Sequence, residues 1–421
     1  MTSPQREPWK HHFVPRSLLR YFCPPDGGEY LYTFDKRTGK SFQTSLMAAG
    51  SENGFNAYEE DGKTVNFERD FDAADALLAT SLKEIHQTRN VAALSPAQRS
   101  SWSDLVAVQL VRTPIIRSTI TTLGEHLNNE VEQMYGMPFG DVPTNNDARR
   151  SARAFFSERE KLKTLLDAKD MVLLEAPENR PFRISDRPVT VQSTLPFGHT
   201  GLGSLGVAIF MPLGQRLMLG MLCPSIRLKL NKLPLERLGL GAEVVTRLVG
   251  LKDGLAAGAA VRLDEAEFER HNQAQIGNCM RFVYGPTDRF DDAQALITAH
   301  PDVRAVHSAI SVGEMGRGPG PAPAMPLGSW LVLFGATEAH MLEVRDVQNG
   351  YPFEATVHNH AALVGALQDG PFSEMRYYVD KNESAGMRDV HVVLLEAEKG
   401  LRVQVRHSSA SLDRLMNKIG G

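Results

Sequence analysis

The residues best suited to chemistry lie close together near the start of the chain, between Lys10 and Phe22. Two adjacent histidines, His11 and His12, are followed after a short interval by Arg16. Histidine can bind a metal or transfer a proton near neutral pH, and arginine is well shaped to bind phosphate. Adjacent residues of an extended chain point to opposite sides, so we do not expect both histidines to bind one ion. One is expected to face a pocket and the other to pack or form a local hydrogen bond.

A helix is expected to begin directly after the two histidines. Pro15 suits the first position of a helix, and the apolar residues that follow it have helical spacing. The expected N-cap, Val14, has no side-chain acceptor for the free N–H groups of the first turn. Free N–H groups at a helix start, close to His12 and Arg16, favour an anion. The segment therefore predicts a site for a phosphate-bearing ligand.

Two carboxylates could complete such a site. Glu68 and Asp72 are four residues apart on a helix expected from Phe67 to about Gln87, so they should share one face. Such a pair could hold a divalent metal, which is a candidate cofactor, or act as a general base. The alternative is a solvated acidic face that the helix dipole favours.

A second helix carries a buried charge. Ser95, Pro96 and Gln98 form a strong helix start, and the helix is expected to end before Pro114. Gln109 and Arg112 share a face of this otherwise apolar helix. Arg112 must find a partner or reach solvent. A structural pair with a carboxylate such as Asp186 and a ligand clamp are both open.

Two polar positions further along the chain join the candidates. Asp186 follows one expected strand, 182–185, and precedes another, 189–192. An aspartate in such a turn often bonds to nearby backbone N–H groups, but strand ends are also where binding sites are built. Asn272 lies on a helix expected from Glu265 to about Phe282, where its amide could bind a ligand or cap a loop.

Several of these blocks carry a family resemblance. His-His-Phe-Val-Pro followed by Leu-Arg-Tyr-Phe, residues 11–15 and 19–22, resembles the opening signature of DUF4238, a family of uncharacterised bacterial proteins. Further blocks in the expected order lie at 109–114, 185–189, 211–213 and 272–284. The resemblance covers residues from about 10 to 285. It implies family membership and no particular activity.

Composition indicates an ordinary cytoplasmic globular protein. The chain has 421 residues, of which 42% are hydrophobic and 23% charged, and a formal net charge of −4. This charge argues against a broadly basic nucleic-acid-binding surface. The three cysteines are far apart and give no disulfide framework or Cys-x-x-Cys pair. No signal peptide and no stretch suited to a membrane span is recognised.

The order of expected elements predicts an α+β fold, in which a helical N-terminal half packs on a mainly antiparallel sheet. The expected helices lie between 67 and 168, and short apolar strands follow from 171 to 222. We expect a DUF4238-like domain at 8–285 and a connecting segment at 286–328, with a Gly/Pro-rich linker at 316–326. A small α+β accessory domain is expected at 329–421.

These residues support two kinds of function. The first is a site for a phosphate-bearing small molecule or nucleic acid, in a phosphodiesterase or nuclease. The alternative is a non-catalytic module for ligand sensing or protein interaction. The catalytic candidates are His11, His12, Glu68 and Asp186, and the ligand-binding candidates are Arg16, Gln109, Arg112 and Asn272. An enzyme of this kind requires the His, Arg and carboxylate side chains to line one cleft. The sequence does not give the substrate, the metal or the oligomeric state.

Overall fold

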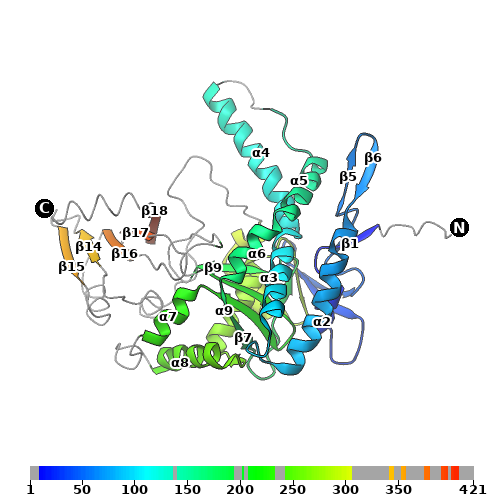
Figure 1. Ribbon diagram of the computed structural model, residues 1–421. Coiled ribbons are helices and arrows are strands. Elements are labelled where there is room, and N and C mark those ends of the chain that lie inside the picture. The colour runs from blue at the N-terminus through cyan, green and yellow to red at the C-terminus, as the bar shows by residue number, and fades with distance from the viewer. Residues whose placement is uncertain are drawn as a thin grey trace.

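The computed structural model describes residues 9–135, 140–193, 202, 207–232 and 242–305, together with strands between 341 and 406. Helices and several antiparallel sheets make up these residues, so the expected α+β class is confirmed (Figure 1).

The described residues between 9 and 305 contain one five-stranded sheet, called the larger sheet below, and its strands lie in the main hydrophobic core. Its strands are β7 (Asp170–Glu175), β9 (Thr190–Ser193), β10 (Val207–Pro212), β11 (Leu217–Leu222) and β12 (Val261–Arg262), in the order β12-β7-β11-β10-β9. All pairings are antiparallel except that of β12 with β7. Every residue of β10 and β11 is buried, so both faces of the sheet centre are covered.

A second sheet joins strands that lie far apart in the sequence. It has the order β3-β2-β13-β8 and consists of β2 (Tyr30–Asp35), β3 (Lys40–Ser45), β8 (Ile184–Ser185) and β13 (Phe282–Gly285). Strands β2 and β3 form an antiparallel hairpin. The helix expected to reach Phe282 ends instead at Asn278, because the following residues pair with β2 and β8.

The helices fall into two groups along the chain, and the last of them, α10, packs against β2 and β13 of the second sheet. The first group is α2 (Asp72–Thr88), α3 (Pro96–Val111), α4 (Pro114–Tyr135), α5 (Asn145–Ser157) and α6 (Arg159–Asp167), and the second is α7 (Pro224–Lys232), α8 (Ala242–Ala257), α9 (Glu265–Asn278) and α10 (Asp291–Ala299). In Figure 1, α2, α3 and α6 stand beside one another, and α4 projects away from the core. The capping box at Ser95 is present as expected. Residues 145–167 form two helices, because α5 ends at Ser157 and α6 begins at Arg159.

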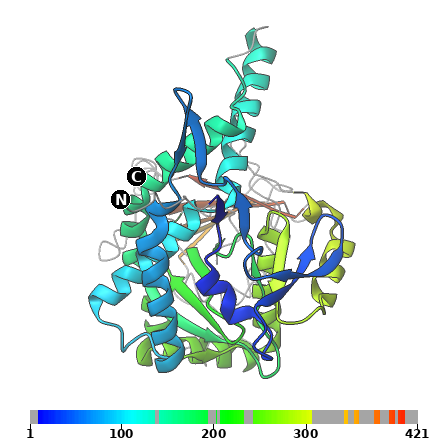
Figure 2. The same cartoon turned by 90° about the vertical axis from the view of Figure 1, so that its right-hand side faces the viewer.

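The opening segment forms a short strand and a short helix. Strand β1 (Lys10–His12) pairs with β4 (Ser51–Asn53), and α1 (Arg16–Leu19) continues into a 3-10 turn at Arg20–Phe22. The N-cap of α1 is Pro15 and not Val14, because the Pro15 carbonyl accepts the first bonds of the turn. Nearby, the hairpin of β5 (Ala57–Glu60) and β6 (Lys63–Asn66) projects from the body, as both views show (Figures 1 and 2).

A separate antiparallel sheet lies near the C-terminus. Its order is β15-β14-β16-β17-β18, with β14 (Met341–Arg345), β15 (Pro352–Thr356), β16 (Glu374–Val379), β17 (Val390–Glu396) and β18 (Gly400–Arg406). The expected linker at 316–326 lies outside the described residues. The division into domains therefore stays a prediction. Among the helices that are described, none has the length and apolar character needed to cross a membrane. The cytoplasmic location likewise stays a prediction.

Candidate functional site

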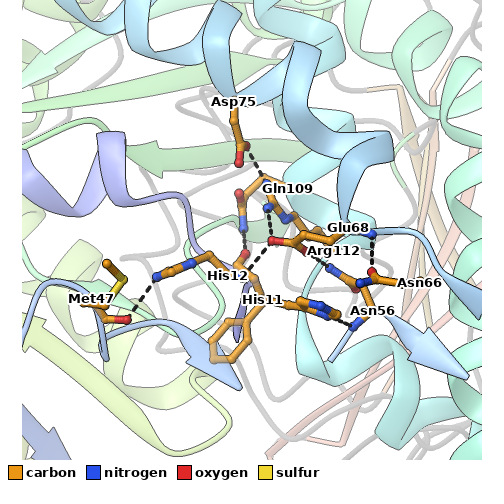
Figure 3. A network of polar contacts seen from close by, with 10 residues as sticks. His11, His12, Met47, Asn56, Asn66, Glu68, Asp75, Gln109 and Arg112 are labelled. Carbon is orange, nitrogen blue, oxygen red and sulfur yellow. Dashed lines mark hydrogen bonds and ion pairs between the residues drawn. The ribbon is translucent and has the colours of Figure 1, made fainter. Parts of the chain in front are cut away.

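The two histidines of the opening segment point to different sides, as their extended backbone requires (Figure 3). His11 is buried, and its Nδ1 accepts a hydrogen bond of 2.7 Å from the backbone N–H of Asn56. His12 is half-buried, and its Nε2 lies 3.2 Å from the carbonyl oxygen of Met47. A carbonyl can only accept, so Nε2 of His12 carries the proton and Nδ1 keeps its lone pair.

The surroundings of His12 keep its imidazole neutral. Burial is the largest cause, and the charge of Arg16 is the next, and together they lower the pKa of His12 to about 4. The charges of Arg112 and Lys10 act in the same direction, while the bond to Met47 opposes them. The half-buried ring therefore sits in a positive field that three cations produce.

Glu68 fastens the strand β1 to the following segment. Its Oε1 accepts the backbone N–H of His12 at 3.1 Å, and its Oε2 accepts a 2.5 Å bond from Nδ2 of Asn56. Oε1 also lies 3.6 Å from Nη2 of Arg112. Oδ1 of Asn66 accepts the backbone N–H of Glu68 at 3.0 Å and so helps to fix the position of that residue. Both oxygens of the carboxylate are thus used within the protein (Figure 3).

Arg112 and Gln109 connect helix α3 to the same network. Arg112 is the C-cap of α3, and its side chain is only 1% exposed. It bonds to Asp75 through Nη1 at 2.5 Å and lies 4.3 Å from the centre of the Phe71 ring. Gln109 donates a 2.7 Å bond to the carbonyl of Phe13, so it holds the opening segment directly.

The structural pair of Arg112 with a carboxylate, one of the two alternatives, is present, but its partners are Glu68 and Asp75 and not Asp186. The expected pairing of Glu68 with Asp72 on one helical face is wrong. Asp72 does not share a helical face with Glu68, because Glu68 lies in a 3-10 turn (Glu68–Phe71) and the α-helix begins at Asp72. The second carboxylate of the cluster is therefore Asp75, one turn further along α2.

Asp186 anchors a different part of the structure. Its carboxylate accepts backbone N–H groups of Met280, Arg281 and Phe282 at 2.7, 2.8 and 2.8 Å. Burial raises the pKa of Asp186, and these three donors oppose that effect. The contacts of the four catalytic candidates therefore fall into two groups, with Asp186 at the start of β13 and the other three at β1.

Asn272 lies in a third part of the structure, separate from the contacts of β1 and from those of Asp186. Its Oδ1 accepts the backbone N–H of Arg183 at 2.9 Å, and its Nδ2 lies 3.4 Å from the carbonyl of Pro181. The same residue lines a cavity of about 680 Å³ between α9 and α10. Asn272 thus positions the chain at the wall of a cavity that the sequence did not reveal.

Arg16 is the predicted ligand-binding residue that faces solvent. Its Nη1 lies 3.7 Å from Sδ of Met47, the residue whose carbonyl meets His12. A thioether is a weak acceptor, so this contact leaves the guanidinium available. The four-residue α1 is too short to support the expected anion site at a helix start, so any anion here must be held by side chains.

Sequence reasoning missed Asn56, Asp75 and Met47, which complete the network around the opening segment. Asp75 carried a signal, because it lies three residues after Asp72 on the same helix, whereas nothing in the sequence marks Asn56 or Met47. Among the described residues, no group of three or more His, Cys, Asp or Glu side chains is arranged to hold a metal ion.

The sequence that contains this network matches the model of a known family. The model of a family described as protein of unknown function (DUF4238) matches residues 10–289. The chain belongs to the DUF4238 family. The DUF4238 region thus contains β1 to β13, the network around His11 and His12, and most of the cavity wall. No curated protein and no solved structure matches the chain.

Proposed function

We propose that the DUF4238 domain binds a phosphate-bearing ligand at the surface formed by His12, Arg16 and Met47, as a ligand-sensing module without a catalytic step. The observation that carries this proposal is the convergence of two side chains on one residue. His12 Nε2 meets the carbonyl oxygen of Met47, and Arg16 Nη1 meets its sulfur. An imidazole and an exposed guanidinium therefore share one patch, which we call the His12 patch.

Charge around the His12 patch favours an anion. Lys10 and Arg16 are exposed, and both lower the pKa of His12, as does Arg112 from the interior. The field that disfavours a proton on the ring attracts a phosphate group. Arginine adds a planar fork of donors that matches phosphate oxygens.

Binding is better supported than hydrolysis. A phosphodiesterase or nuclease would use a free carboxylate or a well-tuned imidazole to move protons. The carboxylate oxygens of Glu68 and Asp186 already accept hydrogen bonds from donors within the protein. His12 has a free lone pair on Nδ1, but a pKa of about 4 makes it a weak base at neutral pH.

Calorimetric titration of the full chain with inorganic phosphate, AMP and a short single-stranded oligonucleotide tests this proposal. We expect Arg16→Ala and His12→Ala to weaken binding of the best of these ligands at least about tenfold. Arg20→Ala is the matched control, because Arg20 is exposed on the adjoining turn and pairs with Glu29. This control should stay within about twofold of the unchanged chain.

The pH dependence separates the proposal from its rivals. Because His12 has a pKa of about 4 in the free chain, its ring stays neutral between pH 8 and pH 6, and its contribution to phosphate affinity should change little over this range. Below pH 6 the ring begins to take up a proton, and its contribution to phosphate affinity should rise. Binding of Mg²⁺ or Mn²⁺ that strengthens at pH 8 and is lost in His12→Ala would overturn it in favour of a metal site. Turnover of bis(p-nitrophenyl) phosphate that His12→Ala abolishes would restore the hydrolase interpretation.

A further inference from the structure

The cavity between α9 and α10 has features of a built ligand site that is separate from the His12 patch. Its volume is about 680 Å³, which is in the size range of small-molecule sites. Asn272 of α9 holds one side by bonding to the backbone at Arg183 and Pro181. The segment Arg289–Asp292 at the start of α10 forms the other side.

Arg183 is the central residue of this cavity. Its side chain is 9% exposed, and its guanidinium lies 4.5 Å from the centre of the Phe290 ring. Nη2 bonds to the carbonyl of Arg289 and lies 3.3 Å from Asp292, while Nε and Nη1 have no partner among the described residues. A buried guanidinium with two unpartnered nitrogens is costly, and an anionic group entering the cavity would offset that cost.

Gly285 explains how the guanidinium reaches this position. A Cβ at Gly285 would lie 2.5 Å from Nη1 of Arg183, so a larger residue there would force the guanidinium to shift from its place against β13. Arg183 is therefore held between the backbone of β13 and the Phe290 ring, inside the wall of the cavity. A cation fixed in this way is prepared for a ligand in advance.

Both signs of charge line the cavity in equal numbers. The cations are Arg180, Arg183 and Arg289, and the carboxylates are Glu269, Asp291 and Asp292. Arg180 is occupied by ion pairs with Glu265 and Glu269. Within the described residues, no hydrogen bond or ion pair involves the exposed side chains of Arg289 and Asp291, which flank Phe290.

We propose that this cavity binds a zwitterionic ligand, either a free α-amino acid or a short peptide with free termini. Arg289, supported by the field of Arg183, would hold the carboxylate, and Asp291 would hold the ammonium group. A phosphate dianion fits less well, because it carries no positive group for the exposed carboxylate of Asp291. Phe268 and Leu296 provide apolar surface for the body of the ligand.

Thermal-shift measurements on the full chain with each of the twenty L-amino acids, leucylalanine and alanylleucine, followed by calorimetry of the best ligand, test this proposal. We expect at least one of them to bind. Its amide, which lacks the carboxylate, and its analogue without the ammonium group should bind at least tenfold more weakly. No binding by any of these compounds at 5 mM, or tighter binding of inorganic phosphate, would overturn the proposal.

Variants show whether the binding uses this cavity. Arg289→Ala should weaken zwitterion binding at least fivefold, and Asp291→Asn should weaken it without affecting the analogue that lacks the ammonium group. Both residues are exposed, so these variants should fold even if Arg183→Met does not. Arg262→Ala is the control, because Arg262 is exposed outside the cavity wall, and Arg16→Ala should also leave this binding unchanged. Equal binding by Arg289→Ala and the unchanged chain would refute the assignment.

Discussion

Replacing Arg112 by methionine gives a sharp test of the network that holds the opening segment. The Arg112 side chain is 1% exposed and that of its partner Glu68 is 12% exposed, so removing the guanidinium leaves a buried carboxylate without its counter-charge. Loss of one partner of such a pair costs about 3–5 kcal/mol of unfolding free energy. Glu68 keeps its bonds from His12 and Asn56, and Asp75 is exposed enough to regain water, so we expect about 3 kcal/mol, the lower end of that range.

Urea denaturation followed by circular dichroism measures this cost, and a double-mutant cycle assigns it. Glu68→Gln removes the carboxylate charge, so Arg112→Met together with Glu68→Gln should be less destabilising than the sum of the two by about 1–2 kcal/mol. The control is Arg150→Met, which breaks an exposed pair with Asp147 and should cost less than about 1 kcal/mol. If Arg112→Met costs no more than this control, or if the two changes are additive, the pair does not stabilise the fold as argued.

Two further predictions concern the stability of the fold in acid and the packing of Gly50, which lies in the turn before β4. The folded chain lowers the pKa of His12 to about 4 and that of His271 to about 3, against 6.5 in the unfolded chain, mainly by burial. Stability should therefore be complete above about pH 6.5 and fall as the pH drops toward 4, and a flat unfolding free energy over this range would contradict both shifts. Gly50→Ala should cost more than Gly62→Ala in the same denaturation assay, by about 1–2 kcal/mol. Both glycines have positive φ, but a Cβ at Gly50 would lie 2.8 Å from Cβ of Val14, whereas nothing lies within 4 Å at Gly62, so equal costs would refute this packing argument.

Local pattern was sufficient to predict most elements of the fold. The capping box at Ser95 and the apolar runs of β7, β10 and β11 depend on residues close in sequence, so they could be identified directly. The errors occur where the local structure depends on pairing with a strand that is distant in the sequence. The helix predicted to reach about Phe282 ends at Asn278, and residues 282–285 join β2, which lies some 250 positions earlier. The short strands β1 and β4 also exist through their mutual pairing and have little signal of their own.

The candidate site was predictable in residue type but not in arrangement. Helical spacing brought Gln109 and Arg112 to one face, and extended backbone separated the two histidines, and the structure has both features. Sequence could not show that the partner of Arg112 is Asp75, because α2 and α3 meet only in the folded chain. Arg183 did carry a signal, since an arginine inside the buried run 182–185 must find a special environment.

The two histidines of the His-His pair perform different tasks in the folded chain. His11 turns inward to Asn56, and the backbone of His12 is held by Glu68, which Arg112 holds in turn. The next residues are fixed by Gly50, whose carbonyl accepts the N–H groups of Phe13 and Val14 and whose own N–H donates to Tyr284 of β13. One segment therefore connects helix α3 to the second sheet, and this connection holds the half-buried imidazole of His12 and the exposed guanidinium of Arg16 in a fixed relation.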